Sequence, residues 1–82
     1  MPWLVYLLRC RDGSLYTGIT NDLPHRLDSH HRGKASAYTR ARRPVALAYQ
    51  EVVPDRGSAL KREAAIRRLS RLEKLALCSA RT

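Results

Sequence analysis

Five polar side chains, spread over most of an 82-residue chain, are of the types that cleave phosphodiester bonds. In chain order they are Tyr6, Tyr16, Arg26, His30 and Glu63. An arginine can bind a phosphate, a tyrosine or histidine can orient water or move a proton, and a carboxylate can hold a divalent cation. The set therefore indicates a site that cuts the backbone of a nucleic acid.

The charge of the chain favours a polyanionic partner. Sixteen Lys and Arg residues against seven Asp and Glu residues give a net charge of +9, and most of the positive charges are arginines spread along the chain. Guanidinium groups bind phosphate at two points, so nucleic acid is the expected partner. A membrane is not expected as a partner, because no hydrophobic run approaches the roughly 20 residues that span a bilayer.

The cysteines and the N-terminus predict the compartment. Cys10 and Cys78 lack the spacing of metal ligands, and the apolar start has no basic region before it and is interrupted by Arg9. We therefore expect a reduced, cytoplasmic protein, with residues 1–80 forming a single domain.

Periodicity and turn residues predict a β-hairpin and a helix in the first half. Trp3 to Arg9 and Leu15 to Thr20 are predicted strands, and the residues between them have turn chemistry. Asn21 or Asp22 can cap a short helix that ends at Gly33.

The second half predicts a strand and two helices after a basic surface loop over 33–44. Val45 to Val53 has strand character, with Val45, Leu47 and Tyr49 facing inward. Ser58 can cap a helix over 59–69, and a capping box of Ser70 and Glu73 starts the last helix. The predicted order is ββαβαα.

Helical spacing places two of the five polar residues beside the core. Arg26 and His30 recur with Leu23 and Leu27 at i, i+3, i+4 and i+7, so they share or border the apolar face. The alternative is an ordinary solvated helix face.

Glu63 is the only acidic residue of its predicted helix and shares a face with Ala59, Leu60 and Ile66, which are expected to pack on the sheet. A buried carboxylate needs a partner. A salt bridge with Arg67 or Arg26 is the structural alternative. The functional one is a magnesium ion, which keeps much of its hydration shell and needs few protein ligands.

The two tyrosines have the same parity on the two strands of the hairpin. A turn near Asp12 and Gly13 gives paired residues whose numbers sum to about 25, which places Tyr6 close to Gly18 and Tyr16 near Arg9. Both tyrosines could simply pack on a sheet face. A glycine inside a strand, however, often marks the close approach of another group, and a phosphate could come close at Gly18.

The ordered set resembles the GIY-YIG nuclease superfamily, most closely its small stand-alone bacterial members, the YhbQ-like group. The half-motifs are Leu4-Val5-Tyr6 and Tyr16-Thr17-Gly18, followed by Gly18-Ile19-Thr20-Asn21, Arg26-x-x-x-His30, Tyr38-Thr39 and Glu63. The likeness runs from about Trp3 to Cys78. Two departures from the pattern are Leu4-Val5 in place of glycine and isoleucine, and the absence of an asparagine near Leu75.

The resemblance implies an α/β (α+β) sandwich, with a three-stranded antiparallel sheet flanked by helices, and metal-dependent hydrolysis of a phosphodiester. It implies that Glu63 holds Mg²⁺ or Mn²⁺, that Arg26 binds the phosphate, and that Tyr6 orients or deprotonates the attacking water. Tyr16 would complete the network, His30 would relay a proton or assist Tyr6, and Gly18 would make room for the backbone.

Because many family members bind through additional domains, we expect low sequence specificity here, and a protein partner could supply more. DNA is expected more than RNA, and DNA repair is a setting that would use the activity. Backbone contacts are expected from Arg40, Arg42, Arg43, Lys61, Arg67 and Arg68, and Tyr38 could either stack on a base or cover the core. A non-catalytic nucleic-acid binder and an adaptor that docks on an acidic protein remain the alternatives.

Overall fold

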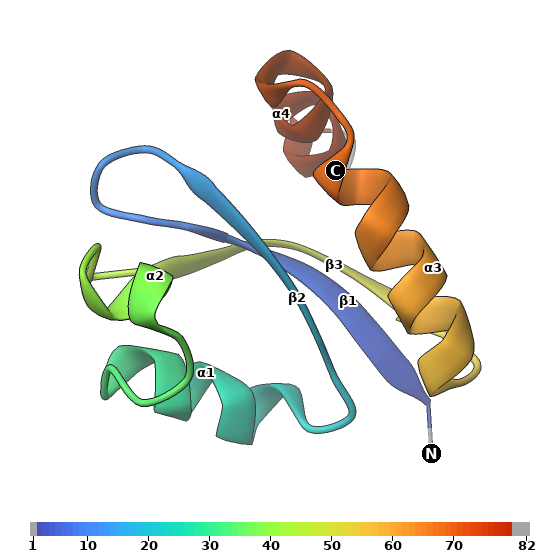
Figure 1. The fold of residues 1–82 in the computed structure, drawn as a ribbon, viewed down its shortest axis with the longest axis horizontal. Coiled ribbons are helices and arrows are strands. Elements are labelled where there is room, and N and C mark those ends of the chain that lie inside the picture. The colour runs from blue at the N-terminus through green and yellow to red at the C-terminus, as the bar shows by residue number, and fades with distance from the viewer. Residues whose placement is uncertain (1, 80–82) are drawn as a thin grey trace.

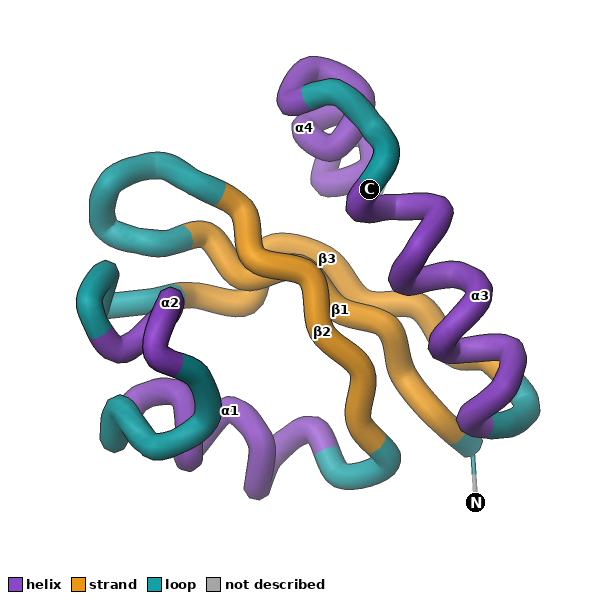
Figure 2. The backbone as a smooth tube through the Cα atoms, in the orientation of Figure 1, coloured by secondary structure: helices purple, strands orange, loops and turns teal. Residues whose placement is uncertain are grey.

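A three-stranded antiparallel sheet divides the chain into two helical layers (Figure 1). The computed structural model describes residues 2–79, so Met1 and Ala80, the ends of the predicted domain, lie outside the described residues. Strand β1 (Trp3–Arg9) is central, between β2 (Leu15–Thr20) and β3 (Ala46–Val53). Figure 2 shows helices on both sides of the sheet. This confirms the predicted sandwich.

Strand β1 is apolar along its length because both of its faces are covered. Tyr6 and Leu8 belong to a cluster on the side of helix α1 (Leu23–His31), whereas Val5 and Leu7 pack with residues of helix α3 (Arg56–Arg67). All four side chains are fully buried. Burial of alternate residues on opposite faces fixes which side of the sheet each polar group of β1 enters.

The β-hairpin is confirmed, but its register differs by one residue from the prediction. Tyr6 pairs with Gly18 and Leu8 pairs with Tyr16, so the paired numbers sum to 24, and Leu15 is the residue opposite Arg9. The turn between Cys10 and Ser14, in which the Gly13 N–H donates to the Cys10 carbonyl at 2.9 Å, fixes the register, and shifting it by one would move every side chain of β2 to the other face. Tyr6 and Tyr16 consequently share the α1 face.

Helix α1 follows its sequence signals closely. The Asp22 side chain accepts a hydrogen bond from the His25 N–H, and Pro24 stands in the first turn. Gly33, with φ of +76°, follows the C-terminal cap, as expected for a residue that must adopt a left-handed conformation.

The predicted surface loop over 33–44 contains a short helix, α2 (Ala37–Arg40), so that prediction was wrong in part. The Ser36 side chain caps it by accepting from the Thr39 N–H at 3.1 Å. Four residues cannot stabilise a helix by themselves. Helix α2 is held because Thr39 is fully buried against α1.

Strand β3 contains a bulge that the alternating pattern did not predict. Leu7 pairs with Tyr49 and Leu8 pairs with Leu47, so Ala48 is left over in the ladder. Leu47 therefore packs on the α1 side and Tyr49 on the α3 side, although both were predicted to face the same way.

Helix α3 begins before the predicted start. Asp55, and not Ser58, is its cap: the Asp55 carboxylate accepts from the Ser58 N–H at 2.7 Å. Ala59 and Ile66 face the sheet as predicted, whereas Leu60 is 41% exposed and does not. The last helix, α4 (Arg71–Ser79), starts with the predicted capping box, in which Ser70 and Glu73 exchange side-chain-to-backbone bonds of 2.9 and 3.2 Å.

The observed order is thus the predicted ββαβαα with one short helix added before β3. Over residues 2–79, the structure contains no helix of the length and hydrophobicity needed to cross a membrane.

Candidate active site

The candidate site is centred on the hydroxyl of Tyr6, which points from the central strand toward α1. The hydroxyl lies 2.9 Å from His30 Nε2, and both residues are fully buried. Burial is the main cause that raises the pKa of Tyr6 above its usual value of 10.0. The phenol is therefore neutral at physiological pH and takes part as a hydrogen-bonding hydroxyl.

His30 is held on its other side by helix α2. Its Nδ1 lies 2.8 Å from the hydroxyl oxygen of Thr39. Burial, with the positive charge of Arg26 and His31 as smaller causes, lowers the pKa of His30 to about 4. The imidazole is consequently neutral at pH 7 and has one N–H donor and one acceptor nitrogen.

Arg26 brings an unpaired donor to the same place. Its guanidinium acts on the Tyr6 hydroxyl at close range and lowers the pKa of Tyr6, opposing the effect of burial. Its Nε is buried and has no hydrogen-bond partner among the described residues. Leaving a buried N–H unpaired costs about 1–3 kcal/mol, so a native structure that does so calls for an explanation.

Glu63 lies on α3, in the helical layer opposite to α1. Its negative charge is among the causes that raise the pKa of Tyr6, and its side chain is only 18% exposed. The predicted structural alternative is present as well, since Arg67 Nη2 lies 3.5 Å from Glu63 Oε2. Arg67 is itself 59% exposed, so this bond is a weak competitor for the carboxylate.

Tyr16 and Tyr38 form an aromatic wall beside His30. The Tyr16 ring packs edge-on against His30, with centroids 5.4 Å apart, and stacks on Tyr38 at 5.8 Å. The guanidinium of Arg42 lies over the Tyr38 ring, 3.8 Å from its centroid. Tyr38 therefore covers Tyr16 and supports Arg42, while its side chain stays 39% exposed, so the expected stacking on a base stays a prediction.

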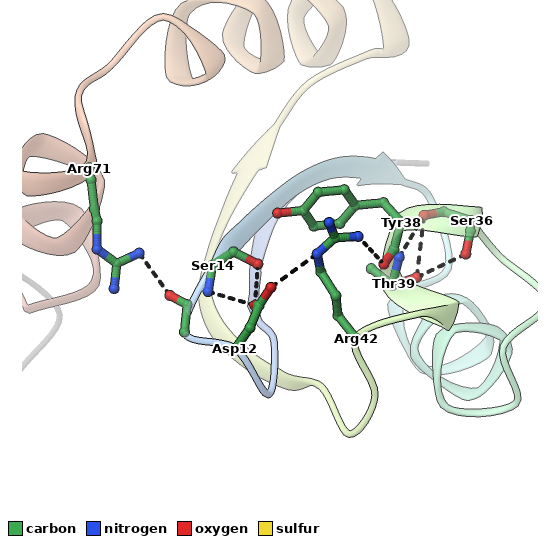
Figure 3. A network of polar contacts seen from close by, with 8 residues as sticks. Asp12, Ser14, Ser36, Tyr38, Thr39, Arg42 and Arg71 are labelled. Carbon is green, nitrogen blue, oxygen red and sulfur yellow. Dashed lines mark hydrogen bonds and ion pairs between the residues drawn. The ribbon is translucent and has the colours of Figure 1, made fainter.

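A polar network ties this wall to the hairpin turn and to α4 (Figure 3). Arg42 donates to Asp12 at 3.0 Å, and the Asp12 carboxylate also accepts from the Ser14 hydroxyl and N–H. Arg71 of α4 donates to the Gly13 carbonyl at 2.7 Å. These bonds fix the rim of the site next to Tyr38.

Gly18 is close to another group as predicted, but that group is a side chain of the protein. A Cβ at Gly18 would collide with the Tyr6 hydroxyl and ring. Tyr6 is paired with Gly18 on the adjacent strand and its side chain lies across the glycine, so Gly18 makes room for Tyr6. The expected approach of a phosphate to this backbone stays a prediction.

The predicted nucleic-acid contacts form two groups. Arg40 and Arg43 line a pocket beside α2 together with Arg11 and His31, and Arg43 donates to the carbonyls of Arg40 and His31. Lys61, Arg67 and Arg68 are exposed on or next to α3. The two groups therefore belong to opposite layers, with the site between them.

Comparison with known proteins identifies the family. The profile of the GIY-YIG catalytic domain matches residues 2–76. The chain belongs to the GIY-YIG family.

Small bacterial GIY-YIG relatives match over nearly the whole chain. A UPF0213 protein of Xanthomonas axonopodis pv. citri is 51% identical over 96% of this chain and 78% of its own length. A UPF0213 protein of Staphylococcus saprophyticus is 47% identical over 92% of each chain. The solution NMR structure of a UPF0213 protein from Bacillus halodurans, 40% identical, superimposes with a TM-score of 0.63 and covers 99% of this chain and 86% of that one.

The residues of this GIY-YIG domain fit a magnesium or manganese ion better than a metal held by many protein ligands. Within residues 2–79 there is no cluster of three or more His, Cys, Asp or Glu side chains. The mostly buried carboxylate of Glu63 is a hard oxygen ligand that suits an ion which keeps most of its waters.

Two functional contacts were missed at the level of the sequence. Thr39 was noted only as part of the motif Tyr38-Thr39, and Asp12 only as a turn residue. The serine at position 36, a good N-cap residue three positions before Thr39, was the available signal for α2. No local pattern shows that Asp12 meets Arg42, because the two are far apart in sequence.

Proposed function

We propose that the protein is a divalent-metal-dependent endonuclease that hydrolyses phosphodiester bonds in nucleic acid, DNA more than RNA, with low intrinsic sequence specificity. The observation that carries the proposal is the buried, unpartnered Nε of Arg26 beside the Tyr6 hydroxyl. A phosphate oxygen is the kind of partner that such a donor lacks.

Arg26 would bind the scissile phosphate. A phosphate placed against its guanidinium would lie next to Tyr6. Because the site is partly dry, a charged donor there stabilises the extra negative charge of the transition state more strongly than it would in water.

Tyr6 would orient the attacking water, with His30 as the acceptor of its proton. At neutral pH both groups are uncharged, because burial raises the pKa of Tyr6 and lowers that of His30. Tyr16 would hold the ring of His30 in place through the edge contact between them.

Glu63 would hold the cation. Bound Mg²⁺ or Mn²⁺ supplies charge neutralisation at the phosphate and at the leaving oxygen. The carboxylate would release Arg67 to do so, and this exposed guanidinium would then be free for the nucleic-acid backbone.

The substrate would run across β2 from one basic group to the other. Arg67 and Lys61 on α3 would contact the backbone on one side, and Arg40, Arg42 and Arg43 around α2 on the other. Phosphate contacts give affinity without sequence information, which is the reason for the expected low specificity. A protein partner could add specificity.

The test is a nicking assay on supercoiled plasmid with Mg²⁺ or Mn²⁺, comparing the native protein with Glu63→Gln. We expect the substitution to lower the rate by about a hundredfold or more. Glu51→Gln is the matched control, because it makes the same change in a carboxylate on the α3 face of the sheet, bonded to Tyr49 and Arg62. That control should cut at the native rate.

Cutting that survives Glu63→Gln unchanged would contradict the metal assignment. Salt-sensitive binding to DNA with no cutting under either metal would favour a non-catalytic binder. Neither binding nor cutting would favour an adaptor that docks on an acidic protein.

A further inference from the structure

A buried chain of hydrogen bonds extends from Tyr6 beyond the residues that the proposed function uses. It runs from Tyr6 to His30, from His30 to Thr39, and from the Thr39 hydroxyl to the Ser36 carbonyl at 3.4 Å. Tyr6, His30 and Thr39 are all fully buried. The direction of each proton in this chain can be worked out from the donors and acceptors present.

The Tyr6 proton sets the direction at one end. A buried hydroxyl that does not donate is costly, and Arg26, the charged neighbour, has only donors. Within the part of the chain that the structure describes, the acceptor within hydrogen-bonding distance of Tyr6 Oη is His30 Nε2. Tyr6 therefore donates to His30, and Nε2 carries no proton.

The Ser36 carbonyl sets the same direction at the other end. The Thr39 hydroxyl donates to Ser36, whose carbonyl oxygen lies 3.4 Å and whose hydroxyl oxygen lies 3.3 Å away, and it presents its own oxygen to His30. A neutral imidazole without a proton on Nε2 carries its proton on Nδ1, which is the atom 2.8 Å from the Thr39 oxygen. Both ends of the chain thus require the same tautomer.

We propose that Thr39 is a positioning residue that holds His30 as the Nδ1–H tautomer, so that Nε2 always faces Tyr6 as a proton acceptor. The use made of that acceptor rests on the proposed function; the tautomer itself does not. The neutral state that the argument needs agrees with the low pKa of His30, about 4.

The chemical role follows from the balance of protons. As the water oxygen bonds to phosphorus, the P–O bond to the leaving oxygen breaks. One O–H bond of the water also breaks and its proton joins Tyr6 Oη, while the Tyr6 proton passes to His30 Nε2. The site then holds an imidazolium, whose Nδ1–H still donates to Thr39. The opposite tautomer could not take part, because its Nε2 already carries a proton.

The direct test is the ¹⁵N NMR spectrum of the imidazole nitrogens of His30 in the labelled full chain at neutral pH. We expect the ¹⁵N chemical shift of Nδ1 to be that of a protonated ring nitrogen and the shift of Nε2 to be that of an unprotonated one. Thr39→Val removes the hydroxyl at nearly constant volume, so we expect the single Nδ1–H pattern to be lost and nicking to fall by about tenfold. Thr39→Ser keeps the hydroxyl and should restore both.

Ser36→Ala is the matched control for damage to α2. It removes the Ser36 hydroxyl, which accepts from the Thr39 N–H and lies 3.3 Å from the Thr39 hydroxyl, but keeps the carbonyl that also accepts from the Thr39 hydroxyl. The expected result is a lower melting temperature with an unchanged His30 spectrum.

An Nε2–H tautomer in the native protein would overturn the proposal. So would an unchanged spectrum in Thr39→Val, or a change in Ser36→Ala as large as that in Thr39→Val. The spectrum requires no enzymatic activity. If the native protein does not cut nucleic acid, the proposed function fails, but the spectrum still decides the tautomer. If Thr39→Val does not fold, the spectra of the native protein and of Thr39→Ser still test the proposal.

Discussion

Two tyrosine-centred polar networks lie on opposite faces of the same sheet, and they are built differently. On the α3 face, the Tyr49 hydroxyl donates to Glu51 at 2.7 Å, and Arg62 Nε lies 3.0 and 2.9 Å from the two Glu51 oxygens. On the α1 face, Tyr6 meets a neutral His30 and an arginine whose Nε has no partner among the described residues.

The difference is one of charge compensation. Glu51 and Arg62 neutralise each other: the pKa of Arg62 is raised, first of all by its hydrogen bond to Glu51. Such a network links β3 to α3 and needs nothing further. Arg26 and Glu63 act on Tyr6 from opposite layers, Arg26 Nε has no partner among the described residues, and Glu63 is paired only with the exposed Arg67 at 3.5 Å. Both charges are therefore less completely compensated than those of Glu51 and Arg62. A closed network stabilises the fold, whereas an open one can bind.

Replacing Arg26 or Arg62 with alanine gives the largest expected contrast between the two networks. Arg26→Ala should lower the nicking rate by about 10²–10³-fold, because it removes the donor to the phosphate, and should leave stability nearly unchanged. Arg62→Ala should keep the native rate and lower the free energy of unfolding by about 1 kcal/mol. Plasmid nicking and urea denaturation measure the two effects. Loss of cutting in Arg62→Ala would remove the distinction between the networks.

Removing the two tyrosine hydroxyls compares the networks atom for atom. Tyr6→Phe leaves the Nε2 acceptor of His30 buried without a donor and removes the group that orients water, so we expect a loss in rate of about a hundredfold. Tyr49→Phe leaves the pair of Glu51 and Arg62 intact, and its rate should equal that of the native protein. Equal rates for the two variants would show that Tyr6 serves only in packing.

The smallest expected effect is the dependence of the free energy of unfolding on pH through His30. The pKa of His30 is about 4 in the folded protein, below the ordinary value of 6.5, so the unfolded chain binds the proton more readily. Stability from this group is present above pH 6.5 and is lost as the pH falls toward 4. Between pH 7.5 and pH 5 the loss is about 2 kcal/mol.

Urea denaturation at both pH values checks this loss, with His30→Gln as the reference that lacks the titrating group. The native protein should lose about 2 kcal/mol more than the variant. Equal losses would mean that His30 titrates normally in the folded protein, which would also contradict its burial between Tyr6 and Thr39.

Much of the fold could be predicted because its signals are local. The Asp22 cap, the glycine after α1 and the capping box of Ser70 and Glu73 depend on residues within one turn of each other. The errors arose where long-range contacts decide. The bulge in β3 turns Tyr49 to the other face, and α2 exists because Thr39 packs against His30.

The site divides in the same way. Sequence by itself determined the types of the five polar residues, the helical faces of Arg26, His30 and Glu63, and the basic character of the chain, since these follow from residue type and periodicity. Only the tertiary structure decided that Tyr6 lies across Gly18, that Tyr38 is covered by Arg42, and that Thr39 meets Nδ1 of His30. The physical reason is that strand register and the direction of a buried hydrogen bond are set by groups distant in the chain, which become neighbours only when the two helical layers close on the sheet.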